Sequence, residues 1–234
     1  SRYVVRDENG MMYNCRIKGR MRLDDIKSTN PVAVGDYVVF EPDGDDSVIS
    51  ELLERKNYVV RRSTNLSKQI HVLAANVDQA LLLVTINYPV TTTVFIDRFL
   101  ASAEAFGVPV IMVFNKVDRY DSKHLEDLEL YKAIYADMGY KVLEVSAKYE
   151  QGLEEVKECL KGKISVIAGH SGVGKSTLIN KIEPGLELKT DEISEVNNSG
   201  KHTTTFAEMH EFSFGGYVID RAGIRGFGIA NIDK

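Results

Sequence analysis

Several things are scarce or missing in this 234-residue sequence, and each absence excludes a class of protein. No apolar run approaches the length that spans a bilayer, and no basic and apolar signal peptide stands at the start. The two cysteines, Cys15 and Cys159, lie far apart without a CxxC spacing, so we expect reduced thiols in a cytosolic protein. The net charge of −5 argues against non-specific nucleic-acid binding by the whole molecule, although it allows a local basic face.

What is present is the composition of a globular protein, with 44% hydrophobic and 27% charged residues and a length that suits one large domain or two ordinary ones. Residues 1–62 read as short alternating strands with hairpin signals at Asn9-Gly10 and Asp43-Gly44. This pattern predicts an all-β barrel of the OB or SH3-like kind. The predicted strands are Tyr3–Arg6, Met11–Lys18, Tyr37–Glu41 and Ser47–Leu53.

Four cations of this first unit recur at every second position: Arg16, Lys18, Arg20 and Arg22. In a strand that spacing places all four side chains on one face. One interpretation is a solvated row of charges. The other is a surface that contacts a phosphate backbone, with Tyr13 as a stacking partner.

Residues 63–71 are polar and without periodicity, and we interpret them as a linker. From residue 72 to 234, apolar strands alternate with helices, which predicts an α/β domain with a mostly parallel sheet. The last two strands, Phe206–Phe214 and Tyr217–Asp220, are expected to form an antiparallel hairpin. The other predicted elements are strands at Gln79–Ile86, Val108–Phe114, Lys141–Val145 and Ile164–Ala168, and helices at Val94–Phe106, Ser122–Met138, Leu153–Leu160 and Lys175–Ile182.

The segment from Gly169 to Thr177, GHSGVGKST, carries the P-loop spacing between a buried strand and a helix. Glycines allow a tight turn whose N–H groups point at phosphate oxygens, and the helix adds the positive end of its dipole. Lys175 would neutralise the β- and γ-phosphates and Ser176 would be a ligand of Mg²⁺. The expected phosphate-binding residues are Gly169, Ser171, Gly172, Val173, Gly174, Lys175, Ser176 and Thr177.

Two further motifs follow strands and indicate which base is bound. Asn115-Lys116-Val117-Asp118 offers a carboxylate that accepts two hydrogen bonds from guanine, which adenine cannot donate. Ser146-Ala147-Lys148 resembles the second base-contacting loop of GTPases, where the Ala147 N–H would reach the guanine carbonyl. Both lie at carboxyl ends of strands, where α/β proteins bind ligands. GTP is therefore favoured over ATP, and an ATP-using P-loop enzyme is the rival interpretation.

Two more segments complete a GTPase motif set in an unusual order. Gly200–Thr205, GKHTTT, is placed as a switch in which Thr204 completes the Mg²⁺ shell, and Asp220-Arg221-Ala222-Gly223 gives D-x-x-G. Asp220 would hold a Mg²⁺-bound water, and the Gly223 N–H would meet the γ-phosphate. Because the base motifs precede the P-loop and D-x-x-G comes last, we interpret the domain as circularly permuted.

The barrel followed by NKVD, SAK, GHSGVGKST, GKHTTT and DRAGIRGFG resembles the small-ribosomal-subunit-dependent GTPase A (RsgA) family over essentially the whole chain. The resemblance implies an OB-fold, a permuted GTPase domain and a C-terminal zinc domain with a Cys/His cluster. It also implies GTP hydrolysis that the small ribosomal subunit stimulates during its late maturation, with rRNA and GTP or GDP as partners. We expect a monomer without a membrane partner.

The sequence departs from that family in three places. It reaches Lys234 without a Cys/His cluster, so zinc is expected only in a domain missing from this chain, and it begins at Ser1 inside the barrel, so a first strand is expected to be missing. The family's Asp-Thr-Pro-Gly reads Asp220-Arg221-Ala222-Gly223, which keeps the aspartate and the glycine but adds a cation.

Hydrolysis needs a group that orients the attacking water. Many GTPases use a glutamine directly after D-x-x-G, but Ile224 occupies that position and cannot hydrogen-bond to water. His202 in the switch is the candidate that the chain and the family both indicate. We therefore assign catalysis to His202, Lys175 and Gly223, with Mg²⁺ held by Ser176, Thr204 and Asp220. The alternative is a non-catalytic module that senses guanine nucleotides and binds rRNA.

Overall fold

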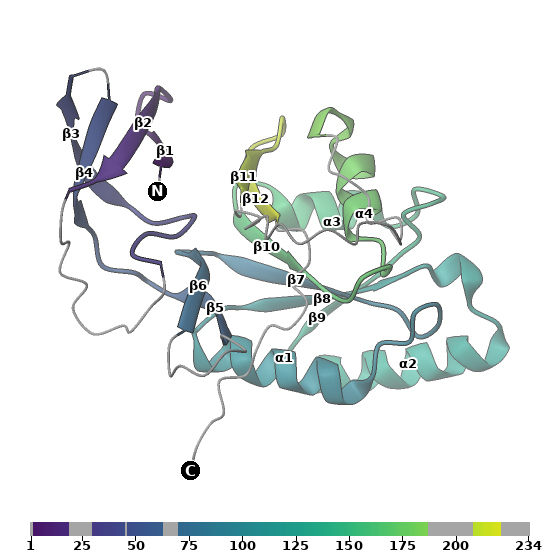
Figure 1. Ribbon diagram of the computed structural model, residues 1–234. Coiled ribbons are helices and arrows are strands. Elements are labelled where there is room, and N and C mark those ends of the chain that lie inside the picture. Colours follow the sequence, from purple (N-terminus) through teal and green to yellow (C-terminus); the bar gives the residue numbers. More distant parts are fainter. Residues whose placement is uncertain (1, 19–29, 45, 63–69, 187–207, 221–234) are drawn as a thin grey trace, which may run out of the picture.

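The computed structural model of the chain describes residues 2–18, 30–44, 46–62, 70–186 and 208–220 (Figure 1). The described residues form a four-stranded sheet, a two-stranded hairpin and a six-stranded sheet covered by helices. Arg20 and Arg22 lie outside the described residues, as do the switch segment 200–205 and residues 221–224.

The N-terminal sheet contains β1 (Arg2–Arg6), β2 (Met12–Ile17), β3 (Val38–Asp43) and β4 (Asp46–Leu52), in the order β1-β2-β4-β3. β2 and β4 run parallel, and the other two pairs are antiparallel. Gly10, with φ 84°, and Gly44, with φ 64°, take left-handed conformations in the two hairpin turns, which glycine adopts without steric penalty. The four strands predicted for this unit are confirmed.

A two-stranded hairpin that the sequence did not predict follows this sheet. β5 (Tyr58–Arg62) pairs antiparallel with β6 (Ile70–Ala75), so residues 70 and 71 at the end of the expected linker belong to a strand. Val59 and Leu73 are buried in the same core as the strands of the larger unit. Burial of these short apolar runs against each other and against that core explains why the segment is a hairpin.

The larger sheet confirms the predicted alternation of strands and helices. Its strand order is β11-β12-β10-β7-β8-β9, with every neighbouring pair parallel except β11 and β12. All six residues of β7 are buried, as expected for a central strand covered on both faces. The strands are β7 (Gln79–Val84), β8 (Val110–Asn115), β9 (Lys141–Val145), β10 (Ile164–Ala168), β11 (Glu208–Glu211) and β12 (Tyr217–Asp220).

Helices cover both faces of this sheet (Figure 1). α1 (Thr93–Ala105) and α2 (Ser122–Asp137) pack on one face, where Phe99 and Leu128 enter the core. α3 (Leu153–Leu160) and α4 (Lys175–Ile182) pack on the other face. Two short 3₁₀ turns, Val117–Arg119 and Pro184–Leu186, complete the described elements.

Polar contacts join the N-terminal sheet to the rest of the chain. Asn76, which follows β6, donates from its Nδ2 to the carbonyl of Gly35 at 3.0 Å. Arg6 of β1 donates to Glu211 Oε2 at 2.6 Å and to the Tyr217 hydroxyl at 3.0 Å, so it touches both strands of the β11–β12 hairpin. The first sheet therefore contacts the edge of the larger one.

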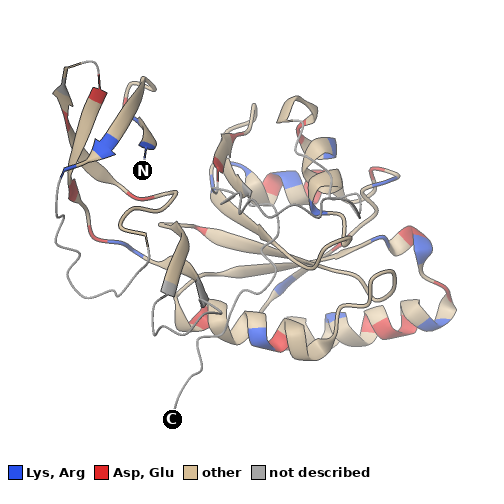
Figure 2. Ribbon diagram, viewed as in Figure 1, with Lys and Arg blue, Asp and Glu red and all other residues tan. Residues whose placement is uncertain are grey.

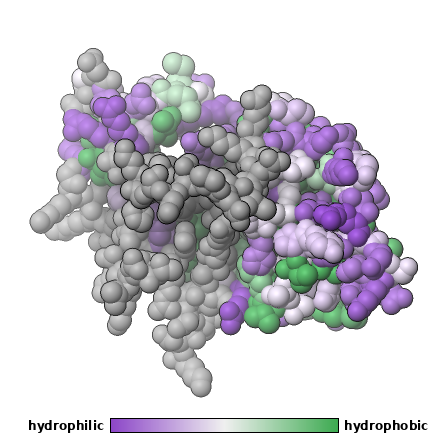
Figure 3. All heavy atoms as spheres, turned by 45° about the vertical axis from the view of Figure 1, so that its right-hand side comes forward, coloured by the Kyte–Doolittle hydropathy of each residue, from purple (hydrophilic) through white to green (hydrophobic). Residues whose placement is uncertain are grey.

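The surface is strongly polar. Lys, Arg, Asp and Glu are spread over both units, with the two signs interspersed along α2 (Figure 2). In the space-filling view, hydrophilic residues dominate the visible face of the larger unit, with small separate hydrophobic patches (Figure 3). None of the helices in the described ranges combines the length and apolarity that a membrane crossing requires. Cys15 and Cys159 are both free thiols, as expected.

Candidate nucleotide site

Three of the predicted motifs meet at the carboxyl ends of the parallel strands of the large sheet. β7, β8, β9 and β10 run parallel, so their carboxyl ends lie together. The P-loop leaves β10, Asn115–Asp118 leaves β8, and Ser146–Lys148 leaves β9. The structure thus brings the proposed phosphate loop and both base loops to the same place.

Asn115 joins these three loops. Its side chain is fully buried at the end of β8. The Nδ2 atom donates to the carbonyl of Val173 in the P-loop at 2.8 Å, and Oδ1 accepts the backbone N–H of Ala147 at 3.2 Å. Asn115 thus links the loop after β8 both to the P-loop and to the loop after β9.

Asp118 and Ser146 hold the two base loops together. The Ser146 hydroxyl donates to Asp118 Oδ1 at 2.5 Å, while the Asp118 side chain remains exposed. The hydrogen bond from Ser146 fixes the orientation of this carboxylate. Lys148 follows in the exposed part of the loop, with its Nζ 5.0 Å from the centroid of the Tyr149 ring.

Lys116 ties the P-loop to the loop after β7. Its backbone takes the left-handed conformation with φ 64°. Its Nζ donates to the carbonyl of Gly172 at 2.6 Å and to the carbonyl of Tyr88 at 2.9 Å. Burial, with the neighbouring charge of Arg119, lowers the pKa of Lys116 from its ordinary value. The extended stem of this lysine is therefore held between the two loops.

Glycine is required at two points of the P-loop. Gly169 has φ 140°, and a Cβ there would lie 2.5 Å from the carbonyl oxygen of Leu83. Gly174 has φ 99°, and a Cβ there would lie 2.4 Å from Asn115 Nδ2. Any side chain at either position would push the loop away from β7 or from Asn115. These contacts make the P-loop backbone part of the same packed unit as the base loops.

Lys175 and Ser176 begin α4 directly after that loop. The Lys175 Nζ donates to the carbonyl of Gly169 at 3.0 Å and to the carbonyl of His170 at 2.8 Å, so its charge lies inside the curve of the loop. The His170 ring packs against Phe95 of α1 with centroids 3.9 Å apart. Burial, and then the charge of Lys175, lower the pKa of His170, which favours the neutral imidazole.

Several predicted site residues lie outside the described part of the chain: His202, Thr204 and Gly223, as well as Arg20 and Arg22 of the basic row. β12 ends at Asp220 beside β10, although the side chain of Asp220 is not described. Within the described ranges, no group of three or more His, Cys, Asp or Glu side chains is placed to hold a metal ion.

Two of the four cations in the predicted basic row, Arg16 and Lys18, lie in the described part of the chain. Arg16 and Lys18 are exposed on the same side of β2, and Arg16 lies opposite Arg2 of β1. Tyr13, however, lies on the other side of the strand: its ring centroid is 4.9 Å from that of Phe40, and its hydroxyl donates to Asp7. The expected stacking role for Tyr13 is wrong because odd and even residues of a strand face opposite sides.

Tyr120 is a site residue that the sequence did not reveal. Its buried hydroxyl donates to the carbonyl of Asn115 at 2.9 Å and accepts the N–H of Ile86 at 3.0 Å. Burial raises the pKa of Tyr120 to about 12, so the group stays protonated and keeps donating. Its position two residues after Asp118 is the only local signal, because the partner Ile86 lies 34 residues earlier.

The P-loop follows β10, whereas the two loops joined to it follow β8 and β9, which come earlier in the chain. This arrangement defines a P-loop GTPase with its motifs in permuted order. Comparison with known proteins supports this class. The model of the RsgA GTPase family matches residues 52–230, and that of the RsgA N-terminal domain matches residues 1–49. The chain belongs to the RsgA family of GTPases.

Relatives and solved structures agree with this assignment. The chain is 53% identical to the small ribosomal subunit biogenesis GTPase RsgA of Bacteroides fragilis, over 99% of this chain and 75% of that protein. The corresponding protein of Flavobacterium johnsoniae is 51% identical, over 99% and 72%. The crystal structure of YjeQ from Thermotoga maritima superposes with a TM-score of 0.76 at 39% identity, covering 97% of this chain and 73% of that one. YloQ, a circularly permuted GTPase, gives 0.69 at 26% identity, covering 99% and 70%.

Proposed function

We propose that this GTPase acts in the cytoplasm as a monomer and hydrolyses GTP to GDP and phosphate when the small ribosomal subunit stimulates it, during late maturation of that subunit. The observation that carries the proposal is Asn115, whose buried amide joins the P-loop to the base loop at Ala147. The relatives are named as small ribosomal subunit biogenesis GTPases, which supports the partner.

The base end of the site selects guanine. Asp118, fixed by Ser146, accepts hydrogen bonds from the guanine edge, and the Ala147 N–H donates to the guanine carbonyl. The stem of Lys116 lies along the base, since its Nζ is anchored on Tyr88 and Gly172. Adenine would leave the Asp118 carboxylate without its donors, and an unpaired polar group in a closed site is expensive.

The phosphate end is the loop Gly169–Gly174 with Lys175. Its backbone N–H groups and the start of α4 face the anion, and Lys175 exchanges its bonds to loop carbonyls for bonds to the β- and γ-phosphates. The donor set fits Mg²⁺, since the Ser176 hydroxyl starts the helix beside the lysine and Mg²⁺ prefers oxygen ligands shared with phosphates. Bound Mg²⁺ would neutralise charge on the γ-phosphate, and Thr204 and Asp220 are the further ligands we propose.

Water attacks the γ-phosphorus in line, the bond to the β–γ bridging oxygen breaks, and GDP leaves. We assign His202 to orienting that water and the Gly223 N–H to the γ-phosphate. Support comes from Ile224, which stands where many GTPases place glutamine and cannot hydrogen-bond to water. With no glutamine at that position, intrinsic turnover is expected to be slow and to rise when the subunit orders the switch.

The partner would contact the basic face of β2. Arg16 and Lys18 are exposed on one side of that strand, and Arg20 and Arg22 extend the row in the sequence. Cations at this spacing suit the phosphate backbone of rRNA. Zinc remains a prediction about the family's C-terminal domain.

The proposal is tested by measuring GTP turnover with and without purified small subunits. We expect slow intrinsic hydrolysis, a large rise with subunits, and loss of most of that rise in His202→Ala with GTP affinity nearly unchanged. Tight guanine-nucleotide binding without phosphate release, even with subunits, would instead support the non-catalytic module. Equal turnover of His202→Ala and the unmodified protein would remove His202 from the mechanism.

Guanine selection is tested with Asp118→Asn. An amide donates where the carboxylate accepted, so GTP affinity should fall by at least about 100-fold and xanthosine triphosphate, whose edge offers a carbonyl, should bind instead. Calorimetry with GTP, ATP and xanthosine triphosphate measures both changes. If the unmodified protein held ATP as firmly as GTP, the ATP-using enzyme would be the better interpretation.

A further inference from the structure

The loop that carries Ala147 is closed on itself. It runs from Ser146 to Gly152 between β9 and α3, and its ends pair through two backbone hydrogen bonds of 3.1 Å between Ser146 and Gln151. Gly152 has φ 74°, and a Cβ there would lie 2.2 Å from the carbonyl oxygen of Glu144. The end of the loop therefore packs closely against the backbone of β9, the strand that precedes it.

Glu150 occupies a strained position in this loop. Its φ of 59° is in the left-handed region, which residues other than glycine, asparagine and aspartate seldom adopt. A residue persists in such a conformation when the surroundings determine it, and such residues gather at functional sites. A contact of the Glu150 side chain is thus a candidate for what holds the loop in shape.

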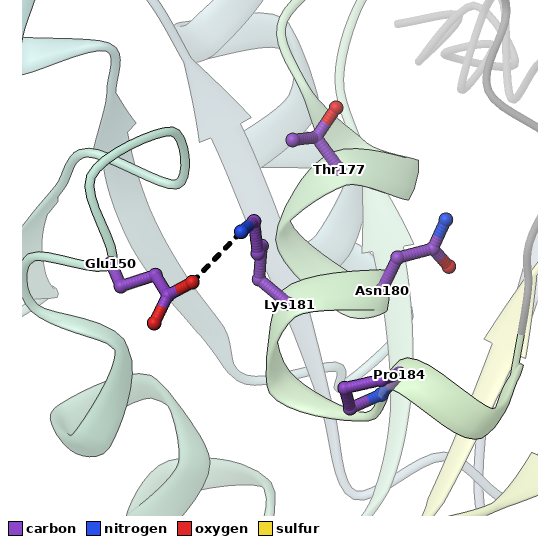
Figure 4. Close-up of a pocket in the computed structure, with 5 residues that line it drawn as sticks. All are labelled: Glu150, Thr177, Asn180, Lys181 and Pro184. Atoms are coloured by element: carbon purple, nitrogen blue, oxygen red, sulfur yellow. Dashed lines mark hydrogen bonds and ion pairs between the residues drawn. The ribbon is translucent and has the colours of Figure 1, made fainter.

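That contact is made with the P-loop helix. Glu150 Oε1 lies 2.8 Å from the Nζ of Lys181, in the last turn of α4 (Figure 4). The two residues line an open pocket of about 450 Å³ together with Thr177, which faces it from the first turn of α4. The ion pair therefore spans from the helix that receives the phosphates to the loop that receives the base.

The other end of the same loop leads to the base site. Ser146 donates to Asp118, and Ala147 donates to Asn115, as described above. A shift of residues 148–151 would move the Ser146–Gln151 pairing and, with it, the N–H of Ala147. We propose that Glu150 and Lys181 are positioning residues that couple α4 to the base loop and slow the release of guanine nucleotides. This inference rests on the guanine site proposed above.

The test distinguishes the effect of the Glu150 carboxylate from the effect of the left-handed backbone conformation at this position. Glu150→Asn removes the ion pair while placing a residue that tolerates the left-handed conformation, and Lys181→Gln removes the cation while keeping the length of the side chain. For exposed ion pairs of this kind, the expected effect is about two- to fivefold faster release of fluorescent GDP, measured by stopped flow. The double variant Glu150→Lys with Lys181→Glu should restore the slower release.

A second ligand distinguishes positioning from general loosening. The 2-aminopurine riboside diphosphate lacks the C6 carbonyl that the Ala147 N–H would contact, so its affinity should change less than that of GDP in both single variants. Equal weakening of both nucleotides would indicate general destabilisation and overturn the proposal. So would a charge-swapped double variant that releases GDP as fast as the single ones.

Lys56→Ala provides a matched control. It removes an exposed ion pair, from Lys56 Nζ to Asp78 Oδ1 at 3.3 Å, at the opposite edge of the sheet where β7 begins. GDP release from this variant should match the unmodified protein. If Glu150→Asn behaves like Lys56→Ala while the unmodified protein binds GDP, only the positioning role fails. If the unmodified protein does not bind GDP, the proposed function fails with it.

Discussion

The two main sheets of this molecule bury their strands differently. β7, in the large sheet, is buried at every residue, and helices cover both of its faces. β1, in the N-terminal sheet, alternates exposed and half-buried residues along its whole length. The covered sheet fixes the loops at its edge from several sides, whereas the half-covered one leaves a strand face open to a partner.

This difference separates two kinds of chemistry. Asn115 at the edge of the covered sheet is fully buried and bonded to two other loops, so its geometry exists before a nucleotide arrives. Arg16 and Lys18 on the open face are exposed, which the phosphate contacts proposed for them require. Substitutions around Asn115 should therefore lower nucleotide affinity strongly, because they disturb a fixed geometry. Substitutions of Arg16 and Lys18 should lower affinity for the partner by an amount that follows the charge removed.

The steepest effect is expected for Gly174→Ala. The new Cβ would lie 2.4 Å from Asn115 Nδ2 and the backbone φ is 99°, so the substitution adds left-handed strain and displaces a buried hydrogen-bonded amide. Together these costs should lower GDP affinity by about 100-fold or more, measured by calorimetry.

Gly139→Ala separates the two causes. Gly139 has φ 90°, but a Cβ there would meet nothing within 4 Å, so the variant carries the strain without the collision. Its GDP affinity should stay close to that of the unmodified protein. Comparable GDP affinities in the two variants would show that contact with Asn115 is not what requires glycine at position 174.

Much of the covered sheet could be predicted because its signals are local. Ile164–Ala168 is a mostly apolar segment followed by glycine, and both it and the helix Lys175–Ile182 have the predicted bounds. The base loops were also predictable, since each motif directly follows a strand. Because the carboxyl ends of parallel strands lie together, the sequence also predicts that these loops are close in space.

What the sequence did not reveal depends on contacts between distant residues. The β5–β6 hairpin needs a core supplied by other elements, and the pairing of Glu150 with Lys181 joins residues 31 positions apart. Lys116 and Glu150 take left-handed conformations although neither is glycine, so their residue types do not predict these conformations. Tyr13 stands at an odd position of β2 and Arg16 at an even one, so their side chains face opposite sides, and Tyr13 packs against Phe40.

An intermediate effect is expected on the open face. Arg16→Glu combined with Lys18→Glu should weaken binding to the small subunit about tenfold and reduce the slope of log affinity against log salt by about two, because two phosphate contacts are lost. Binding assays over a range of salt concentrations measure both. Lys123→Glu with Lys141→Glu, which changes the charge equally on exposed lysines of the large unit, is the control. An unchanged salt slope would remove this face from the interface.

The smallest effect is expected at the start of α1, one of the helices that cover the large sheet. Thr92 is the N-cap of that helix, and its side chain accepts the N–H of Phe95 at 3.3 Å. Thr92→Ala should lower the free energy of unfolding by about 1 kcal/mol, and Thr92→Ser should recover most of it because the hydroxyl is kept. Urea denaturation with GDP absent measures the change. Since Phe95 packs on His170 of the P-loop, a GDP affinity that fell more than about twofold would show that capping this helix also positions the loop.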